Sequence, residues 1–216
     1  MQRNRKNKAG KYDWLSFSQS YLLIAKLGCQ EIIKPCHNKA DHTNFNFEYN
    51  IEELIIPVFY NVKHGIEIFI KTINIIAYSK YDEGHDIKEL FACLKKKLKS
   101  IYLRPFTDCK GNKITQEDIN NLPEKLDDIQ RLIDEFYNLD LLKKKIGGHF
   151  IIFDTKNDIF RYADNKANIQ IKWEKFLDKF KGEDIKILKE KIDKIYTLFN
   201  DVGFLYDVFL NKKKTL

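Results

Sequence analysis

Four polar side chains fall on one line of a mostly apolar segment, YNVKHGIEIFIKTI at residues 60–73. Tyr60, His64, Glu67 and Lys71, which we call the polar stripe, recur one turn apart, so a helix would place them on one narrow face. An imidazole can move a proton near neutral pH, a carboxylate can orient it, and an ammonium can hold a phosphate. The alternative is structural, because buried polar groups must be paired and these side chains could simply satisfy one another and a neighbouring helix.

Two places further along the chain carry groups suited to an anion or a proton. His85 precedes Asp86, which with Glu89 three residues later has the pattern of a helix start. A helix N-terminus attracts anions, although the Asp86 carboxylate competes for the same amide groups. Arg161 and Tyr162 lie in a segment with strand patterning, where Arg161 would either bind phosphate or be an ordinary surface residue of a hairpin.

Apolar residues at helical spacing predict the elements that must position these groups. Thr115 with Asp118, like Asp86 with Glu89, marks a helix start. We expect the basic segment 1–11 to be a flexible arm, and we expect the lysine clusters at 95–99 and 143–145 to lie on helices. The helices are predicted over about 14–33, 50–78, 86–101, 115–136 and 174–212. Pro57 either kinks the second of these helices or opens a new one, and Gly147 and Gly148 stop the helical segment that follows residue 136.

The segment 149–172 has a different pattern, because HFIIFDT, IFRYAD and ANIQIKW read as short strands separated by turns. We therefore predict a mainly α fold: a helical bundle with a small β hairpin or three-stranded insertion near 149–172, in a single domain over 1–216. The last helix carries an apolar seam that suits either a bundle core or a dimer interface. The seam consists of Ile185, Leu188, Ile192, Ile195, Phe199, Val202, Tyr206 and Phe209.

The composition predicts a soluble globular protein with a basic surface. Hydrophobic residues make up 44% and charged residues 32%, the formal net charge is +7, and the pI is about 9.0. A lysine excess permits nucleic-acid binding, although the bias of an AT-rich genome would produce the same excess. Four cysteines in 216 residues do not indicate a disulfide scaffold, so we expect reduced thiols and a cytoplasmic location.

We expect no bound metal, no cofactor and no membrane-spanning segment. Cys29, Cys36, His37 and His42 lie within one short segment, but their spacing fits no zinc pattern. No run approaches the roughly 18 apolar residues that cross a bilayer.

The segment IPVFYNVKHGIEIFIKTI, followed by a short loop and GHDIKELF, resembles the HEPN superfamily (higher eukaryote and prokaryote nucleotide-binding domains). The positions that carry the resemblance are Lys63-His64, Glu67, Lys71 and His85-Asp86-Ile87 with Leu90, and FRYADNK at 160–166 resembles a downstream element of some members. The resemblance covers residues 55–100 and, more loosely, 150–165. It implies an α-helical bundle, often dimeric, that is a defence-related ribonuclease, a nucleotide-binding protein or a non-catalytic module.

One departure from the family pattern concerns catalysis. The ribonuclease branch usually carries an Arg, a polar residue and then a His, with four to six residues between the Arg and the His. No arginine of this chain has a His at that distance. The arginines are Arg3, Arg5, Arg104, Arg131 and Arg161.

We therefore predict a HEPN-like protein that binds or acts on RNA or nucleotides, as a metal-independent endoribonuclease of antiphage defence or a toxin–antitoxin system. The expected partners are RNA or a nucleotide, a second copy of the chain, and an antitoxin or other defence-system protein. The alternatives are a non-catalytic dimerising or partner-binding module, and nucleic-acid binding through lysines alone. The predicted catalytic residues are His64, His85 and Glu67, and the predicted phosphate- or nucleotide-binding residues are Lys71, Arg161 and Tyr162.

Overall fold

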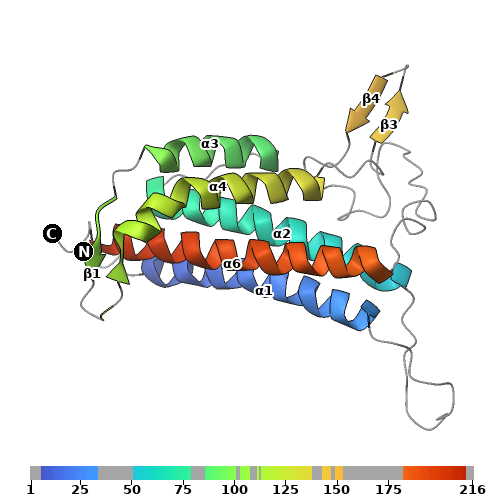
Figure 1. The fold of residues 1–216 in the computed structure, drawn as a ribbon, viewed down its shortest axis with the longest axis horizontal. Helices are drawn as coiled ribbons and strands as arrows, with labels where there is room; N and C mark the ends of the chain where they lie inside the picture. The colour runs from blue at the N-terminus through green and yellow to red at the C-terminus, as the bar shows by residue number, and fades with distance from the viewer. Residues whose placement is uncertain are drawn as a thin grey trace, which may run out of the picture.

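A computed structural model of the chain consists mainly of helices packed side by side (Figure 1). It describes residues 6–33, 51–78, 86–100, 103–107, 111, 113–137, 143–146, 149–152 and 182–212. Within these ranges the helices are α1 (Lys6–Ile33), α2 (Ile51–Tyr78), α3 (Ile87–Lys99), α4 (Gln116–Tyr137) and α6 (Gly182–Lys212). The predicted mainly α bundle is therefore confirmed.

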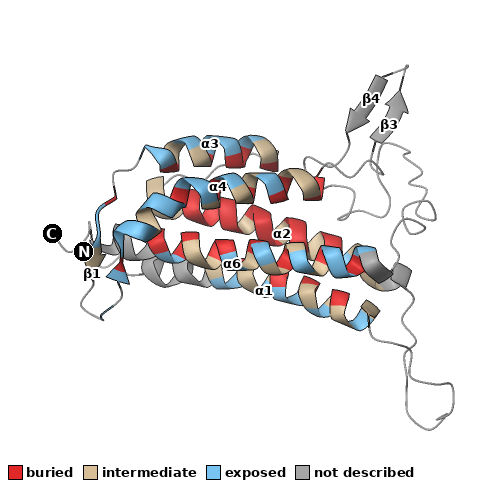
Figure 2. Ribbon diagram, viewed as in Figure 1, coloured by how far each residue is buried: buried red, intermediate tan, exposed pale blue. Residues whose placement is uncertain are grey.

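Helix α2 is the central element, because it contacts α1, α3 and α6. Figure 2 shows buried residues over much of its surface, whereas α1, α4 and α6 also turn exposed faces to solvent. The apolar residues that cover α2 on several sides explain this position, because a helix that is hydrophobic all round must be covered by neighbours. Tightly stacked rings of Phe69 and Phe199, 3.6 Å between centroids, join α2 to α6.

The helix starts predicted at Asp86 and Thr115 are confirmed. The Asp86 carboxylate accepts a hydrogen bond from the Glu89 amide at 3.1 Å and caps α3. Thr115 and Asp118 form a reciprocal cap at the start of α4, since the Thr115 hydroxyl accepts from the Asp118 amide while the Asp118 carboxylate accepts from the Thr115 amide. Each cap satisfies amide groups that the first helical turn leaves without a partner.

Two of the predicted boundaries are wrong. The segment 6–11, predicted as part of a flexible arm, belongs to α1, because no proline separates it from the helix that follows. Lysines 143–145 were expected on a helix but lie in strand β3 (Lys143–Ile146). Pro57 lies inside α2 and opens no new helix.

Two short hairpins complete the described structure. Strand β3 pairs antiparallel with β4 (His149–Ile152), so that Lys143 faces Ile152 and Ile146 faces His149. The predicted hairpin near 149–172 is thus present, but its first strand precedes the predicted segment; residues 153–172 lie outside the described ranges. The second hairpin joins β1 (Phe106–Thr107) to β2 (Lys113–Ile114).

The apolar seam of α6 packs inside the chain, where its residues from Ile185 to Tyr206 are buried. Of the two interpretations of this seam, the structure therefore favours a bundle core over a dimer interface. Among the described helices, none is long and apolar enough to cross a membrane.

Candidate site around His64

The polar stripe lies on a part of α2 that packs closely against α1. A Cβ atom added at Gly65 would lie 3.1 Å from the Ser18 carbonyl oxygen, and one at Gly28 would lie 2.6 Å from the Val58 side chain. The Ser18 hydroxyl donates a hydrogen bond of 2.8 Å to the Gly65 carbonyl. The two glycines therefore allow the antiparallel helices to pack closely beside the stripe.

His64 lies between two half-buried tyrosine rings and keeps 24% of its side-chain surface exposed. The Tyr60 ring, one turn earlier on α2, stacks on the imidazole with 5.5 Å between ring centroids. The Tyr21 ring of α1 meets the imidazole edge-on at 4.6 Å. Two helices thus restrain the orientation of an imidazole that still reaches solvent.

Glu67 lies between a histidine and a lysine and is itself almost fully buried. Its Oε1 accepts a hydrogen bond of 2.8 Å from the Lys71 ammonium, and its Oε2 lies 3.9 Å from His64 Nδ1. The side chains of Glu67 and Lys71 expose only 5% and 8% of their surface. Lys71 therefore fixes the carboxylate, which forms a second ion pair when the imidazole is protonated.

Lys63 lies on the side of α2 that faces the core and is fully buried. Its ammonium nitrogen lies 4.6 Å from the centre of the Tyr137 ring of α4, and the Tyr137 hydroxyl donates a long hydrogen bond of 3.4 Å to the Lys63 carbonyl. Burial lowers the pKa of Lys63 well below 10.5, because a low-dielectric interior disfavours the charged form.

The structure brings together the residues of the polar stripe but does not describe the other predicted site residues. Tyr60, His64, Glu67 and Lys71 form one contiguous group on α2. His85, Arg161 and Tyr162 lie outside the described ranges, so their proposed roles stay predictions.

Sequence reasoning missed Tyr21 as a neighbour of His64, because the contact depends on how closely α1 packs on α2. The small residues Gly28 and Gly65 were a weak signal of that close packing. The prediction from the sequence also missed the burial of Lys63, although the apolar neighbours of Lys63 on α2 could have indicated it.

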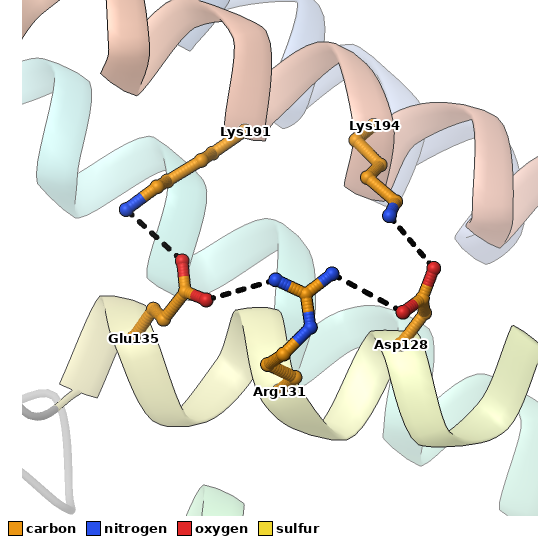
Figure 3. Close-up of polar contacts among 5 residues, drawn as sticks. All are labelled: Asp128, Arg131, Glu135, Lys191 and Lys194. Carbon is orange, nitrogen blue, oxygen red and sulfur yellow. Dashed lines mark hydrogen bonds and ion pairs between the residues drawn. The ribbon is translucent and has the colours of Figure 1, made fainter.

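A second set of charged side chains joins α4 to α6 (Figure 3). Glu135 pairs with Lys191 at 2.9 Å and with Arg131 at 3.1 Å, and Asp128 pairs with Lys194 at 2.7 Å and with Arg131 at 3.1 Å. We call these five residues the surface network. Three of them, Arg131, Glu135 and Lys191, border a groove of about 520 Å³, whose other lining residues are Asp127, Gln130 and Asp134. Acidic and basic side chains line this groove together, so it offers no obvious anion or cation site.

Within the described ranges, no three or more His, Cys, Asp or Glu residues are grouped so that they could hold a metal ion. Comparisons of the chain with protein-family models, curated proteins and solved structures gave no match. The resemblance to the HEPN superfamily therefore stays a prediction that rests on the residues quoted for it.

Proposed function

We propose that this protein binds RNA or a nucleotide at the surface around His64 and uses the imidazole for proton transfer in RNA cleavage. The observation that carries the proposal is the position of His64: partly exposed, stacked on Tyr60 and backed by the Glu67 carboxylate. Aromatic rings on a basic protein are the usual platform for single-stranded nucleic acids, because every base has a face that can stack.

The cleavage step needs a group that removes the proton of a ribose 2′-hydroxyl and a group that protonates the leaving oxygen. His64 suits either role, since an imidazole titrates near neutral pH. Glu67 supports it by facing Nδ1, and Lys71 supports Glu67 through their hydrogen bond. The sequence predicted Lys71 as a phosphate-binding residue. In this proposal Lys71 instead positions Glu67, because its ammonium is buried and hydrogen-bonded to Glu67.

His85, Arg161 and Tyr162 keep their predicted roles in this proposal, as the second acid–base group and the phosphate-binding groups. The biological setting, antiphage defence or a toxin–antitoxin system, is proposed from the resemblance alone. Metal-independent cleavage is proposed on the same basis, and the chain lacks the usual Arg-to-His spacing of ribonuclease members.

A non-catalytic helical module is the second candidate function, and one observation favours it. Glu67 and Lys71 are buried and paired with each other, as expected for a stripe that only holds helices together. The partial exposure of His64 between two tyrosine rings is not required by that role.

The test measures binding and cleavage of labelled single-stranded oligoribonucleotides, first in EDTA and then with magnesium. Tyr60→Leu should weaken binding roughly 5- to 150-fold, the range expected when one stacking ring is lost. His64→Gln should slow cleavage roughly 10²- to 10⁴-fold, as expected when an acid–base group is lost. His149→Gln is the matched control, because it removes an imidazole from strand β4, and it should behave as wild type.

Binding that falls with salt but is unchanged in Tyr60→Leu and His64→Gln would contradict the proposal and favour general binding through lysines. No RNA binding by wild type, together with lowered thermal stability of both variants, would favour the helical module.

A further inference from the structure

A pocket lies at the end of the bundle where α3 ends and α4 begins (Figure 1). Its lining residues come from the end of α3, from the segment 103–105 that precedes β1, and from the first turns of α4. Its volume of about 530 Å³ lies within the range of roughly 300–1,000 Å³ that small-molecule sites occupy. Its described lining includes no residue of the polar stripe or of the surface network, so we call it the α3–α4 pocket and treat it as a separate site.

Aliphatic side chains form most of the wall of the α3–α4 pocket. Four of these five side chains are buried in the core, which holds them in place. The described lining contains no aromatic ring, so a nucleotide base would find nothing to stack on, whereas a hydrocarbon chain would leave water for an apolar surface. The five are Leu98, Leu103, Ile119, Leu122 and Leu126.

The backbone around the α3–α4 pocket is held in place by the fold. Tyr206, fully buried on α6, donates a hydrogen bond of 3.3 Å to the Leu98 carbonyl at the end of α3. Pro105 and Pro123 also line the pocket, and a proline ring fixes the backbone angle φ at each position. A ligand therefore enters walls that need little ordering, which lowers the free-energy cost of binding.

The lining of the α3–α4 pocket carries two positive charges and, among its described residues, no carboxylate. The positive charges belong to Lys99, whose side chain is 43% exposed, and to Arg104, which is also exposed. Long basic side chains of this kind can cover apolar surface with their methylene groups while the charged end stays in water. We therefore expect the two charges at the mouth of the pocket, outside its aliphatic wall.

Lys99 can turn toward a ligand without leaving its present partner unpaired. Its ammonium lies 3.3 Å from Asp127, a residue that does not line the pocket. Lys95 approaches the same carboxylate oxygen more closely, at 2.7 Å. Asp127 therefore keeps an ion pair if Lys99 moves to another anion.

We propose that the α3–α4 pocket binds a small amphipathic anion, an aliphatic chain that ends in a carboxylate. The chain lies against the leucine side chains, and the carboxylate is held by Lys99 and Arg104. Two cations beside an aliphatic wall match both ends of such a molecule, and neither a neutral hydrocarbon nor a nucleotide has both. The proposal does not depend on RNA binding at His64.

Calorimetric titration of the full chain with decanoate, kept below the concentration at which it forms micelles, tests the proposal. We expect saturable binding that tightens up to about fourfold with each methylene added between octanoate and decanoate, because each added group leaves water for the aliphatic wall. Decanol, which lacks the charge, and acetate, which lacks the chain, should both bind more weakly than decanoate.

Variants at exposed positions test the role of the two cations. Lys99→Gln and Arg104→Gln should each weaken decanoate binding roughly 2- to 5-fold, the range of an exposed ion pair, and should leave decanol binding unchanged. Lys113→Gln is the matched control, since Lys113 is an exposed lysine of β2 that does not line the pocket. Lys113→Gln and His64→Gln should both bind decanoate as wild type does.

Photo-cross-linking identifies where the chain of the ligand lies. A decanoate analogue with a diazirine on its alkyl chain should label the segments 98–99, 103–105 and 116–126. Labelling of the exposed apolar side chains of α1 instead would overturn the proposal, as would the absence of saturable decanoate binding or an equal loss in Lys113→Gln. Displacement of decanoate by a lower concentration of AMP would also overturn it and would assign the pocket to a nucleotide.

Discussion

Two regions of this molecule pair acidic with basic side chains, one region in the interior and the other at the surface. In the polar stripe, Glu67 and Lys71 form one ion pair that is almost fully buried on the central helix. In the surface network, Asp128, Arg131 and their neighbours form several ion pairs that solvent still reaches. Burial removes water as an alternative partner, so the stripe pair depends on both of its members, whereas any member of the network can be solvated instead.

The comparison shows that a charged side chain costs free energy on α2, where it is buried, and costs little on the surface of α4 and α6. The surface network needs no function to explain it, because α4 and α6 present charged faces to solvent and such faces pair readily. The stripe places an imidazole, a carboxylate and an ammonium on a helix that is mostly apolar, and the core-facing side of the same helix buries the amine of Lys63. Because burying these groups costs free energy, we propose a function at His64 and not at the groove beside the surface network.

The largest expected effect comes from removing one member of the buried pair. Lys71→Met leaves the Glu67 carboxylate buried without its ammonium, which should lower the free energy of unfolding by about 3–5 kcal/mol. Urea denaturation followed by circular dichroism measures the change. The double variant Glu67→Leu with Lys71→Met should recover most of the loss, and a double variant no more stable than Lys71→Met alone would show that the pair is not the cause.

The close packing that positions the stripe gives the next effect. Gly28→Ala places a Cβ where only 2.6 Å separates it from Val58, so it should lower the free energy of unfolding by about 1–3 kcal/mol. Gly203→Ala on α6 is the control, since its Cβ would meet nothing closer than 3.8 Å. That change should raise the free energy of unfolding by roughly 0.5–1 kcal/mol, because alanine favours a helix over glycine. Equal effects at the two positions would contradict the close contact of α1 and α2.

The buried amine of Lys63 should make stability depend on pH. Its folded pKa lies well below 10.5, so the unfolded chain binds more protons in the window between the two values, and stability rises with pH there. Lys63→Met should remove this slope and raise the free energy of unfolding at neutral pH by an amount on the order of 1 kcal/mol.

The slope is best measured below pH 9.0. Burial raises the pKa of the Cys29 thiol from 9.0 to about 12, so the unfolded chain loses that proton first, and stability falls as the pH rises above 9.0. A wild-type slope identical to that of Lys63→Met would show that the amine stays charged in the folded protein.

The smallest effects are expected in the surface network. Lys194→Gln removes an exposed ion pair with Asp128 and should lower the free energy of unfolding by less than about 1 kcal/mol, and less still at high salt. Hydrogen bonds from Lys194 and then Arg131 hold the pKa of Asp128 below 3.8, so this contribution is present at neutral pH and is lost as the pH falls through that folded pKa. A loss in Lys194→Gln as large as that in Lys71→Met would remove the distinction between the two regions.

Local chemistry explains which parts of the fold the sequence predicts. The helix starts at Asp86 and Thr115 depend on side chains within three residues, and both are found as expected. The placement of the four stripe residues on one face of α2 follows from their helical spacing alone. Strand β3 was not predicted because its three consecutive lysines show no alternation of polar and apolar residues. Its conformation depends on its pairing with β4.

The contact of Tyr21 with His64 needs a tertiary arrangement, since it depends on the approach of α1 at Gly65. The same limit applies to the seam of α6, whose spacing suited two environments equally. Which helices bury a face, and how closely they pack, is set by the whole bundle and not by any one element.

Nuclear magnetic resonance of the His64 ring during an RNA titration tests the central claim most directly. The chain has five histidines, so the His64→Gln variant is enough to assign its ring signal. We expect this signal to shift in parallel with binding of a single-stranded oligoribonucleotide, and the same shift in Tyr60→Leu to require roughly 5- to 150-fold more RNA. A His64 signal that stays in place while the protein is saturated with RNA would contradict the proposed site.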